Sequence, residues 1–169
     1  MDNIKKNFSI RDLENISGIK AHTIRIWEKR YNLLSPERSK TNIRYYSHQN
    51  LQKLLNIVLL NNNNYKISKI SKMSDELINM LDIARKKYGK SMTINSGYRT
   101  PNHNEKVGGK STSSHIKGLA VDIACSNSVD RFKLYDILRE VGFKRVGVGK
   151  TFIHVDIDKD KSPKVFWVY

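Results

Sequence analysis

Long apolar runs and cysteine are scarce in this sequence of 169 residues. No run approaches the roughly 18 apolar residues that span a bilayer, and residues 1–6 lack the apolar stretch of a signal peptide. These absences predict a protein without membrane spans that stays in the cytoplasm. Cys125 is the single cysteine, which excludes an internal disulfide and suits a reducing compartment.

Acidic residues are also in short supply. Lys and Arg total 31 against 16 Asp and Glu, which gives a formal net charge of +15. The excess is divided nearly evenly between the two halves of the chain, so no single basic tail accounts for it. Such a charge attracts polyanions, and it fits nucleic acid and anionic cell-wall polymers equally well.

A linker rich in Pro, Gly or Ser is missing as well, so the domain boundary rests on a change of pattern near residues 74–76. We expect an α+β protein of two domains, 1–75 and 76–169. In the first, Ser9 can cap a helix that Gly18 ends, at the spacing of a helix-turn-helix. The elements predicted there are helices at 10–16, 20–31 and 49–60, one more short helix at 67–73, a loop at 35–42 and a wing strand at 43–46.

The second half mixes helical and strand patterns. Its predicted elements are helices at 77–88 and 129–141 and strands at 92–95, 119–124, 146–148, 152–157 and 165–169. Asp122 interrupts the apolar strand 119–124, and a buried carboxylate is costly unless it is paired or coordinates a cation. His115 precedes this strand and His154 lies in a later one. Two imidazoles and one carboxylate are a common zinc set that leaves a fourth position open for catalysis, provided that the strands pair.

Two segments of this half carry a resemblance. Residues 113–122 match every fixed position of Ser-x-His-x-x-Gly-x-Ala-x-Asp, and residues 96–104 are similar to Ser-Gly-Tyr-Arg-Ser-Pro-x-x-Asn. Both patterns resemble those of the zinc D-Ala-D-Ala carboxypeptidase and murein peptidase family, and the likeness runs from about Glu76 to Tyr169. It implies a small domain with an antiparallel sheet of the Hedgehog/DD-peptidase type.

The resemblance also implies roles for the matched side chains. Zinc (Zn2+) would be held by His115, Asp122 and His154, and it would lower the pKa of a coordinated water towards about 7. Arg99 would bind the substrate carboxylate or the oxyanion of the tetrahedral intermediate. The implied substrate contacts are Arg99, Ser113 and Tyr98. The implied partner is a peptidoglycan peptide or a D-Ala-D-Ala-like substrate.

The sequence departs from that family at the general base. Many members carry Glu or Asp three residues before the last histidine ligand, where this chain has Thr151, which cannot serve. Asp156 shares a strand face with His154, so it is the candidate catalytic base. The alternative is that Asp156 orients a ligand imidazole. Because loss of a base typically costs ~10²–10⁴ in rate, a weak or inactive peptidase is also consistent with the sequence.

The first half resembles the winged helix-turn-helix of MerR-type transcription regulators, from Phe8 to about Glu76, through segments such as 23–31 and 44–46. The resemblance implies binding of double-stranded DNA. The residues expected at the bases are Lys20, His22 and Arg25. Those expected at the phosphates are Tyr31, Arg38, Lys40, Arg44 and Tyr45. The long dimerising helix of that family is replaced by the peptidase-like segment, so the oligomeric state stays open.

Three interpretations follow. The first is a zinc-dependent peptidase of D-Ala-D-Ala carboxypeptidase or murein endopeptidase type, fused to a MerR-like DNA-binding module. The second is a DNA-binding regulator whose peptidase-like domain binds zinc or a cell-wall peptide without cleaving it. In the third, zinc is only structural, and no cleft is large enough for a peptide. A phage-related protein, a gene fusion or an engineered chimera would each combine these halves.

Overall fold

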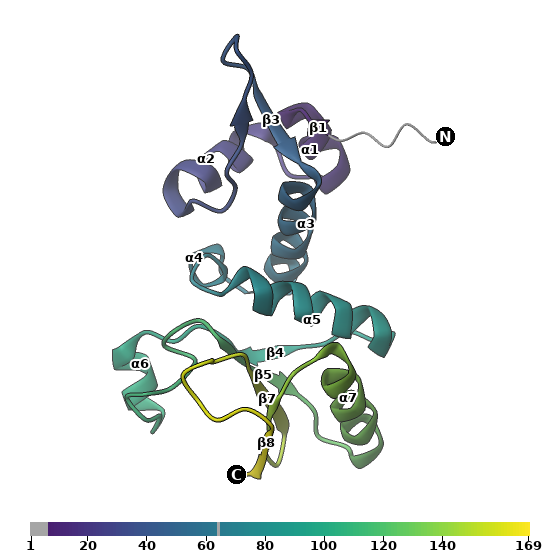
Figure 1. The fold of residues 1–169 in the computed structure, drawn as a ribbon, viewed down its shortest axis with the longest axis vertical. Coiled ribbons are helices and arrows are strands. Elements are labelled where there is room, and N and C mark those ends of the chain that lie inside the picture. The colour runs from purple at the N-terminus through teal and green to yellow at the C-terminus, as the bar shows by residue number, and fades with distance from the viewer. Residues whose placement is uncertain (1–6, 64) are drawn as a thin grey trace. The chain divides into compact units, whose positions relative to one another are not determined.

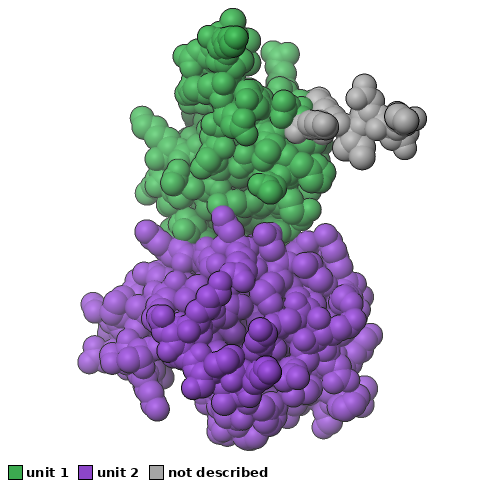
Figure 2. Space-filling model, in the orientation of Figure 1, with its two compact units in different colours: residues 1–71 green, residues 72–169 purple. Residues whose placement is uncertain are grey.

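The computed structural model describes residues 7–63 and 65–169. The segment 1–6, in which the sequence predicts no signal peptide, lies outside the described residues. The chain forms two compact units, Met1–Ser71 (unit 1) and Lys72–Tyr169 (unit 2), which Figure 2 colours separately. No helix among the described residues is long and apolar enough to cross a membrane. The mixture of helices and strands confirms the predicted α+β class.

Unit 1 holds the predicted helix-turn-helix and wing (Figure 1). Its elements are β1 (Asn7–Phe8), α1 (Ile10–Ser17), α2 (Ala21–Tyr31), β2 (Glu37–Arg38), β3 (Arg44–Ser47), α3 (His48–Asn62) and α4 (Ile67–Ile70). Ser9 caps α1 in a capping box with Asp12, and Gly18 ends the helix in a left-handed conformation, as the sequence predicts. Ile24 and Trp27 are buried on the inner face of α2.

The wing is larger than the sequence indicates. β3 pairs with β1 on one edge and with β2 on the other, both antiparallel. Residues 37–42 were expected to form a loop, but Glu37 and Arg38 pair with Tyr45 and Arg44. Two residues are too few to show the apolar–polar alternation by which a strand is predicted. Such a strand is recognised only from its pairing with a neighbouring strand.

Unit 2 is built on a sheet of five strands. Its elements are α5 (Asp75–Tyr88), β4 (Ile94–Ser96), α6 (Pro101–Lys106), β5 (Ala120–Ala124), α7 (Ser128–Val141), β6 (Arg145–Val148), β7 (Phe152–Asp156) and β8 (Val165–Val168). The strand order is β4-β5-β7-β6-β8. α5 and α7 contact each other, and α7 contacts β7 (Figure 1). The buried side chains of Val121, Ile123, Ile153 and Val155 alternate along β5 and β7 and supply the sheet's share of the core.

The sheet is not wholly antiparallel, contrary to expectation. β8 runs parallel to β6, while every other pairing is antiparallel. The chain reverses direction between β7 and β8, as in a hairpin, but β6 already lies between these two strands. Because β6 is antiparallel to β7, a strand that reverses relative to β7 must run parallel to β6.

A short helix follows β4 in the segment that contains His103. α6 begins at Pro101, and its N-cap Thr100 accepts a hydrogen bond from the backbone N–H of His103. Proline in the first turn and threonine at the cap favour a helix start. Six residues are too few to display a helical apolar period, which explains why the pattern alone does not reveal this helix.

Gly118 connects the loop that holds His115 to the start of unit 2. Its carbonyl accepts a hydrogen bond from the backbone N–H of Ser74, the N-cap of α5, at 2.9 Å. Gly118 has a φ of +70°, and a Cβ added there would lie 1.9 Å from the carbonyl oxygen of Lys72. Only glycine fits this close approach, so the Gly of the Ser-x-His-x-x-Gly pattern has a packing role.

We expect Gly118→Ala to lower the free energy of unfolding of unit 2 by about 2–5 kcal/mol, because it adds both backbone strain and a clash. Gly89→Ala is the matched control, since Gly89 has a φ of +71° with nothing within 4 Å of an added Cβ. It should cost about 1–2 kcal/mol. Urea unfolding followed by Trp167 fluorescence, in a Trp27→Phe background, measures both. Equal losses would show that the contact with Lys72 does not constrain the fold.

Candidate metal centre

One row of residues crosses the sheet of unit 2. Asp122 on β5 lies opposite Ser96 on β4 and opposite His154 on β7. His154 in turn lies opposite Gly147 on β6, which lies opposite Trp167 on β8. Because directly paired residues point to the same face of a sheet, the carboxylate and the imidazole are brought together by register alone.

His115 reaches this row from the loop before β5. Its backbone carbonyl accepts hydrogen bonds from the N–H groups of Arg99, at 3.1 Å, and Gly118, at 3.2 Å. Its ring Nδ1 lies 2.8 Å from the carbonyl oxygen of Gly97. These contacts hold the buried ring with Nε2 directed at Asp122 and His154.

The three predicted ligands therefore converge. Oδ1 of Asp122 lies 2.8 Å from Nδ1 of His154 and 3.2 Å from Nε2 of His115. The two ring nitrogens are 3.3 Å apart. In tetrahedral zinc sites, ligand bonds of about 2.0–2.1 Å place neighbouring donor atoms roughly 3.3–3.4 Å apart. The donor triangle is thus close to the size that such an ion requires.

The proton positions favour a cation among these donors. The carbonyl of Gly97 can only accept, so a neutral His115 carries its proton on Nδ1 and a lone pair on Nε2. Nε2 of His154 lies 3.3 Å from Oδ2 of Asp156, which also accepts, so the lone pair of a neutral His154 lies on Nδ1. Two nitrogen lone pairs and a carboxylate oxygen then face one another, an arrangement that a metal ion or a proton stabilises.

The ionisation of the cluster agrees with this geometry. Burial acts to raise the pKa of Asp122, but hydrogen bonds to His115 and His154 outweigh it and hold the pKa well below its usual range. Burial acts to lower the pKa of His154, and the hydrogen bonds to Asp122 and Asp156 reverse this, so the pKa is raised. A proton on His154 and a metal ion therefore compete for the same position between the donors, so metal binding is expected to weaken as the pH falls.

Arg99 contacts the carboxylate of Asp122. Its Nη2 donates to Oδ2 of Asp122 at 2.5 Å, and its Nε donates to Oγ of Ser96 at 2.7 Å. The oxygen of Asp122 that faces the imidazoles is Oδ1. Arg99 thus contacts one oxygen of the carboxylate and leaves the other facing the two imidazoles, an arrangement that the sequence does not predict.

Asp156 lies behind His154. The carboxylate contacts Nε2, on the side of the ring opposite to the donor triangle, and it also accepts from Nε of Arg145 at 2.8 Å and from the backbone N–H of Asp158 at 3.1 Å. Its side chain is 2% exposed. Burial acts to raise its pKa, and the hydrogen bonds and the charge of Arg145 lower it overall. This placement matches the orienting role that the sequence left as an alternative.

A cavity of about 580 Å³ opens beside the donor triangle. Besides the three donors, its lining includes Arg99, Ser113, Ser114, Arg145, Asp156, Lys161, Trp167 and Tyr169. Of the predicted substrate contacts, Arg99 and Ser113 line this cavity and Tyr98 does not. Thr151 is exposed and is also absent from the lining, while its carbonyl accepts from the backbone N–H of Cys125.

The comparison with family profiles agrees with this site. The profile of peptidase M15 matches residues 53–158, which is more than half of the chain and includes all three donors. The chain belongs to the peptidase M15 family.

Several cavity residues of this M15 chain were not predicted. Lys161, Trp167 and Tyr169 lie beyond the matched residues. Gly147 leaves room for the indole of Trp167, since an added Cβ would lie 2.5 Å from it, and the ring centroid of Trp167 lies 5.5 Å from that of His154. The sequence signal for the part of the cavity lined by Trp167 and Tyr169 is the aromatic character of residues 165–169.

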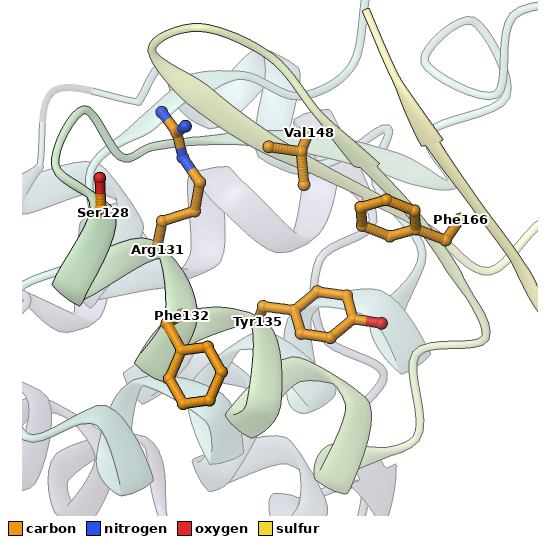
Figure 3. A pocket seen from close by; sticks show the side chains of 6 residues that line it. All are labelled: Ser128, Arg131, Phe132, Tyr135, Val148 and Phe166. Carbon is orange, nitrogen blue, oxygen red and sulfur yellow. The ribbon is translucent and has the colours of Figure 1, made fainter.

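The M15 unit has a second hollow on its surface. Figure 3 shows its lining, which comes from α7 together with Val148 of β6 and Phe166 of β8. Phe132 is 71% exposed, and the rings of Tyr135 and Phe166 meet edge to face. The hollow is largely apolar and brings no carboxylate and imidazole together, so it is not the candidate reactive site.

Most of the predicted DNA contacts in unit 1 are exposed, and three of the arginines lie together. Six of the eight predicted residues are exposed, while Tyr31 and Tyr45 are partly buried. Arg25, Arg38 and Arg44 line one hollow of about 360 Å³ beside the start of α1. Arg11, which the sequence reading missed, joins them there.

The remaining comparisons concern this unit. The profile of the MerR helix-turn-helix family of regulatory proteins matches residues 8–77, which confirms the two-part resemblance. Among solved structures, the chain is similar to one described as HiNmlR, a MerR family regulator lacking the sensor domain, bound to promoter DNA, at 23% identity and a TM-score of 0.35. That match covers 38% of this chain and 48% of the other, so it spans about half of that regulator. A comparison with curated proteins gives no match.

Proposed function

We propose that unit 2 is a zinc-dependent peptidase that cleaves short D-amino-acid-containing or murein peptides, and that unit 1 binds double-stranded DNA. The observation that carries the first part is the donor triangle of His115, Asp122 and His154, which faces a cavity of about 580 Å³. Membership of the M15 family supports the reaction class. The cavity also argues against a purely structural ion, for which no cleft is needed.

The chain's own residues prepare this site. The Gly97 carbonyl and Asp156 fix which nitrogen of each imidazole faces the cavity, and Arg99 fixes the orientation of Asp122. A zinc ion held by these donors supplies a Lewis acid that lowers the pKa of water and polarises a peptide carbonyl. Ser113 and Arg99 line the same cavity, where they can contact the peptide.

A non-cleaving zinc or peptide binder is the second candidate. Among the described residues that line the cavity, the carboxylates are Asp122 and Asp156. Asp122 is a proposed ligand, and Asp156 already accepts from Arg145, from the backbone of Asp158 and from His154. No lining carboxylate is therefore spare for the role of a general base, which favours binding without efficient cleavage.

Cleavage by zinc-loaded full-length chain separates the two candidates. With D-Ala-D-Ala dipeptide and murein fragments as substrates, we expect D-Ala release or fragment cleavage that a chelator abolishes and added zinc restores.

Asp156→Asn should weaken zinc affinity by ~10–100-fold, with turnover recovering at saturating zinc, because Asp156 orients His154. Asp160→Asn is the control, since the side chain of Asp160 is 81% exposed.

Two results would redirect the proposal. A fall of ~10²-fold or more in turnover by Asp156→Asn at full zinc content would make Asp156 the base. Saturable binding of one of these peptides by the zinc-loaded chain, without cleavage of any of them, would establish the non-cleaving binder.

For unit 1, we expect DNA affinity to fall steeply with salt, because exposed Lys and Arg displace counterions from phosphates. Arg44→Ala should weaken all duplexes alike and reduce the salt slope by about 1, whereas Arg25→Ala should also relax base preference. Selection from a random duplex pool, followed by titration at several salt concentrations, measures both. Lys69→Ala, an exposed change on α4, is the control. Unchanged binding by both arginine variants would rule out this surface as the DNA contact.

A further inference from the structure

The metal cavity carries more positive than negative side chains. Its lining includes four cationic residues, Arg99, Lys110, Arg145 and Lys161, but only two carboxylates, Asp122 and Asp156. The two arginines are matched one to one with the two carboxylates. Arg99 pairs with Asp122 at 2.5 Å, and Arg145 pairs with Asp156 at 2.8 Å. The excess positive charge of the cavity therefore belongs to the two lysines.

Lys161 is the lysine that the fold positions. Its Nζ lies 2.8 Å from Oγ of Ser114, and its backbone N–H donates to the carbonyl of Asp158 at 3.3 Å. Oγ of Ser114 donates its own proton to Oδ2 of Asp158, so it accepts from the ammonium group. The side chain of Lys161 is 30% exposed, whereas Lys110 is exposed and has no hydrogen bond from its ammonium group among the described residues.

Asp158, the nearest carboxylate to Lys161, is shared with a second lysine, so it does not fully neutralise the charge of Lys161. Asp158 is bound by Lys117, whose Nζ lies 3.1 Å from each of its oxygens, while Nζ of Lys161 lies 3.8 Å from Oδ2. Asp160 is the second partner of Lys117, and its side chain points to solvent, being 81% exposed. One buried carboxylate is thus shared by two ammonium groups, and Lys161 is the one that lines the cavity.

A hydrogen bond links Lys161 to the residue that precedes the proposed ligand His115. Ser114, which accepts its hydrogen bond, directly precedes His115, and both line the cavity. An ammonium group has three donors, of which Ser114 takes one. The others can reach a ligand that enters the cavity, and the half-buried stem loses less freedom on binding than an exposed lysine does.

We propose that Lys161 binds a free carboxylate of the peptide substrate, so that unit 2 selects peptides with a C-terminal carboxylate next to the bond at the metal. This rests on the proposed function and deepens it, because it favours carboxypeptidase substrates over internal bonds of a longer strand. Arg99, whose guanidinium is bound to Asp122 and Ser96, is a positioning residue for the metal ligand and not the main carboxylate contact.

The test compares D-Ala-D-Ala dipeptide with its C-terminal amide on the zinc-loaded full-length chain. The wild type should bind the free acid ~10–100-fold more tightly than the amide, the range for a charge-assisted hydrogen bond. Lys161→Met should raise the KM and Kd for the acid by that factor, with the amide and the zinc content unchanged. Lys161→Arg should keep the preference, and Lys164→Met, an exposed change in the same loop, should have no effect.

Binding by calorimetry and cleavage by D-Ala release are measured side by side. Preferential binding of the acid that depends on Lys161, without cleavage, would support Lys161 while overturning the peptidase. Cleavage of acid and amide at equal KM would support the peptidase while overturning Lys161. A Lys161→Met variant that lowers kcat equally for both ligands, or a wild type that binds neither, would also overturn this assignment.

Discussion

The structure of unit 2 depends on the mutual approach of three electron-pair donors that repel one another unless a cation lies among them. Sheet register brings Asp122 opposite His154, and the loop closed by Gly118 adds His115. Each donor residue is oriented by a hydrogen-bond contact at its other polar atom. The carbonyl of Gly97 contacts His115, Asp156 contacts His154, and Arg99 contacts Asp122. Burying so many polar groups is costly, and the cost is offset only if the set works together.

The same contacts determine the polarity of the cavity. Both of its carboxylates are paired with arginines, which leaves no acidic group spare and leaves the charge of Lys161 incompletely balanced. A cavity of this kind attracts an anionic ligand and contains no obvious proton acceptor. The proposed affinity for a carboxylate and the lack of a spare general base among the lining carboxylates therefore have a common physical origin, the pairing of Asp122 and Asp156 with arginines.

Part of this site could be predicted from the sequence. A carboxylate in an apolar strand and two histidines at family spacing identified the donors, because local pattern carries that information. The partners of Arg99 and Asp156 could not be read in the same way, since they depend on which strands pair. Trp167 reaches the cavity because β8 pairs with the far edge of β6, a topology that no apolar alternation encodes. Lys161 reaches it from the connection between β7 and β8, through contacts with Ser114 and Asp158 that are distant in sequence or lie in a turn. In unit 1, the helices followed from caps and periodicity, whereas the two-residue strand β2 exists only through its pairing with β3.

The metal content of purified full-length chain tests the central claim most directly. We expect about one zinc per chain, with X-ray absorption showing two nitrogen and at least one oxygen ligand at about 2.0–2.2 Å. His115→Ala should lose most of this zinc, while His103→Ala, an exposed change on α6, should keep it. Full zinc stoichiometry in His115→Ala would contradict the account, because the ion would then lie outside the donor triangle.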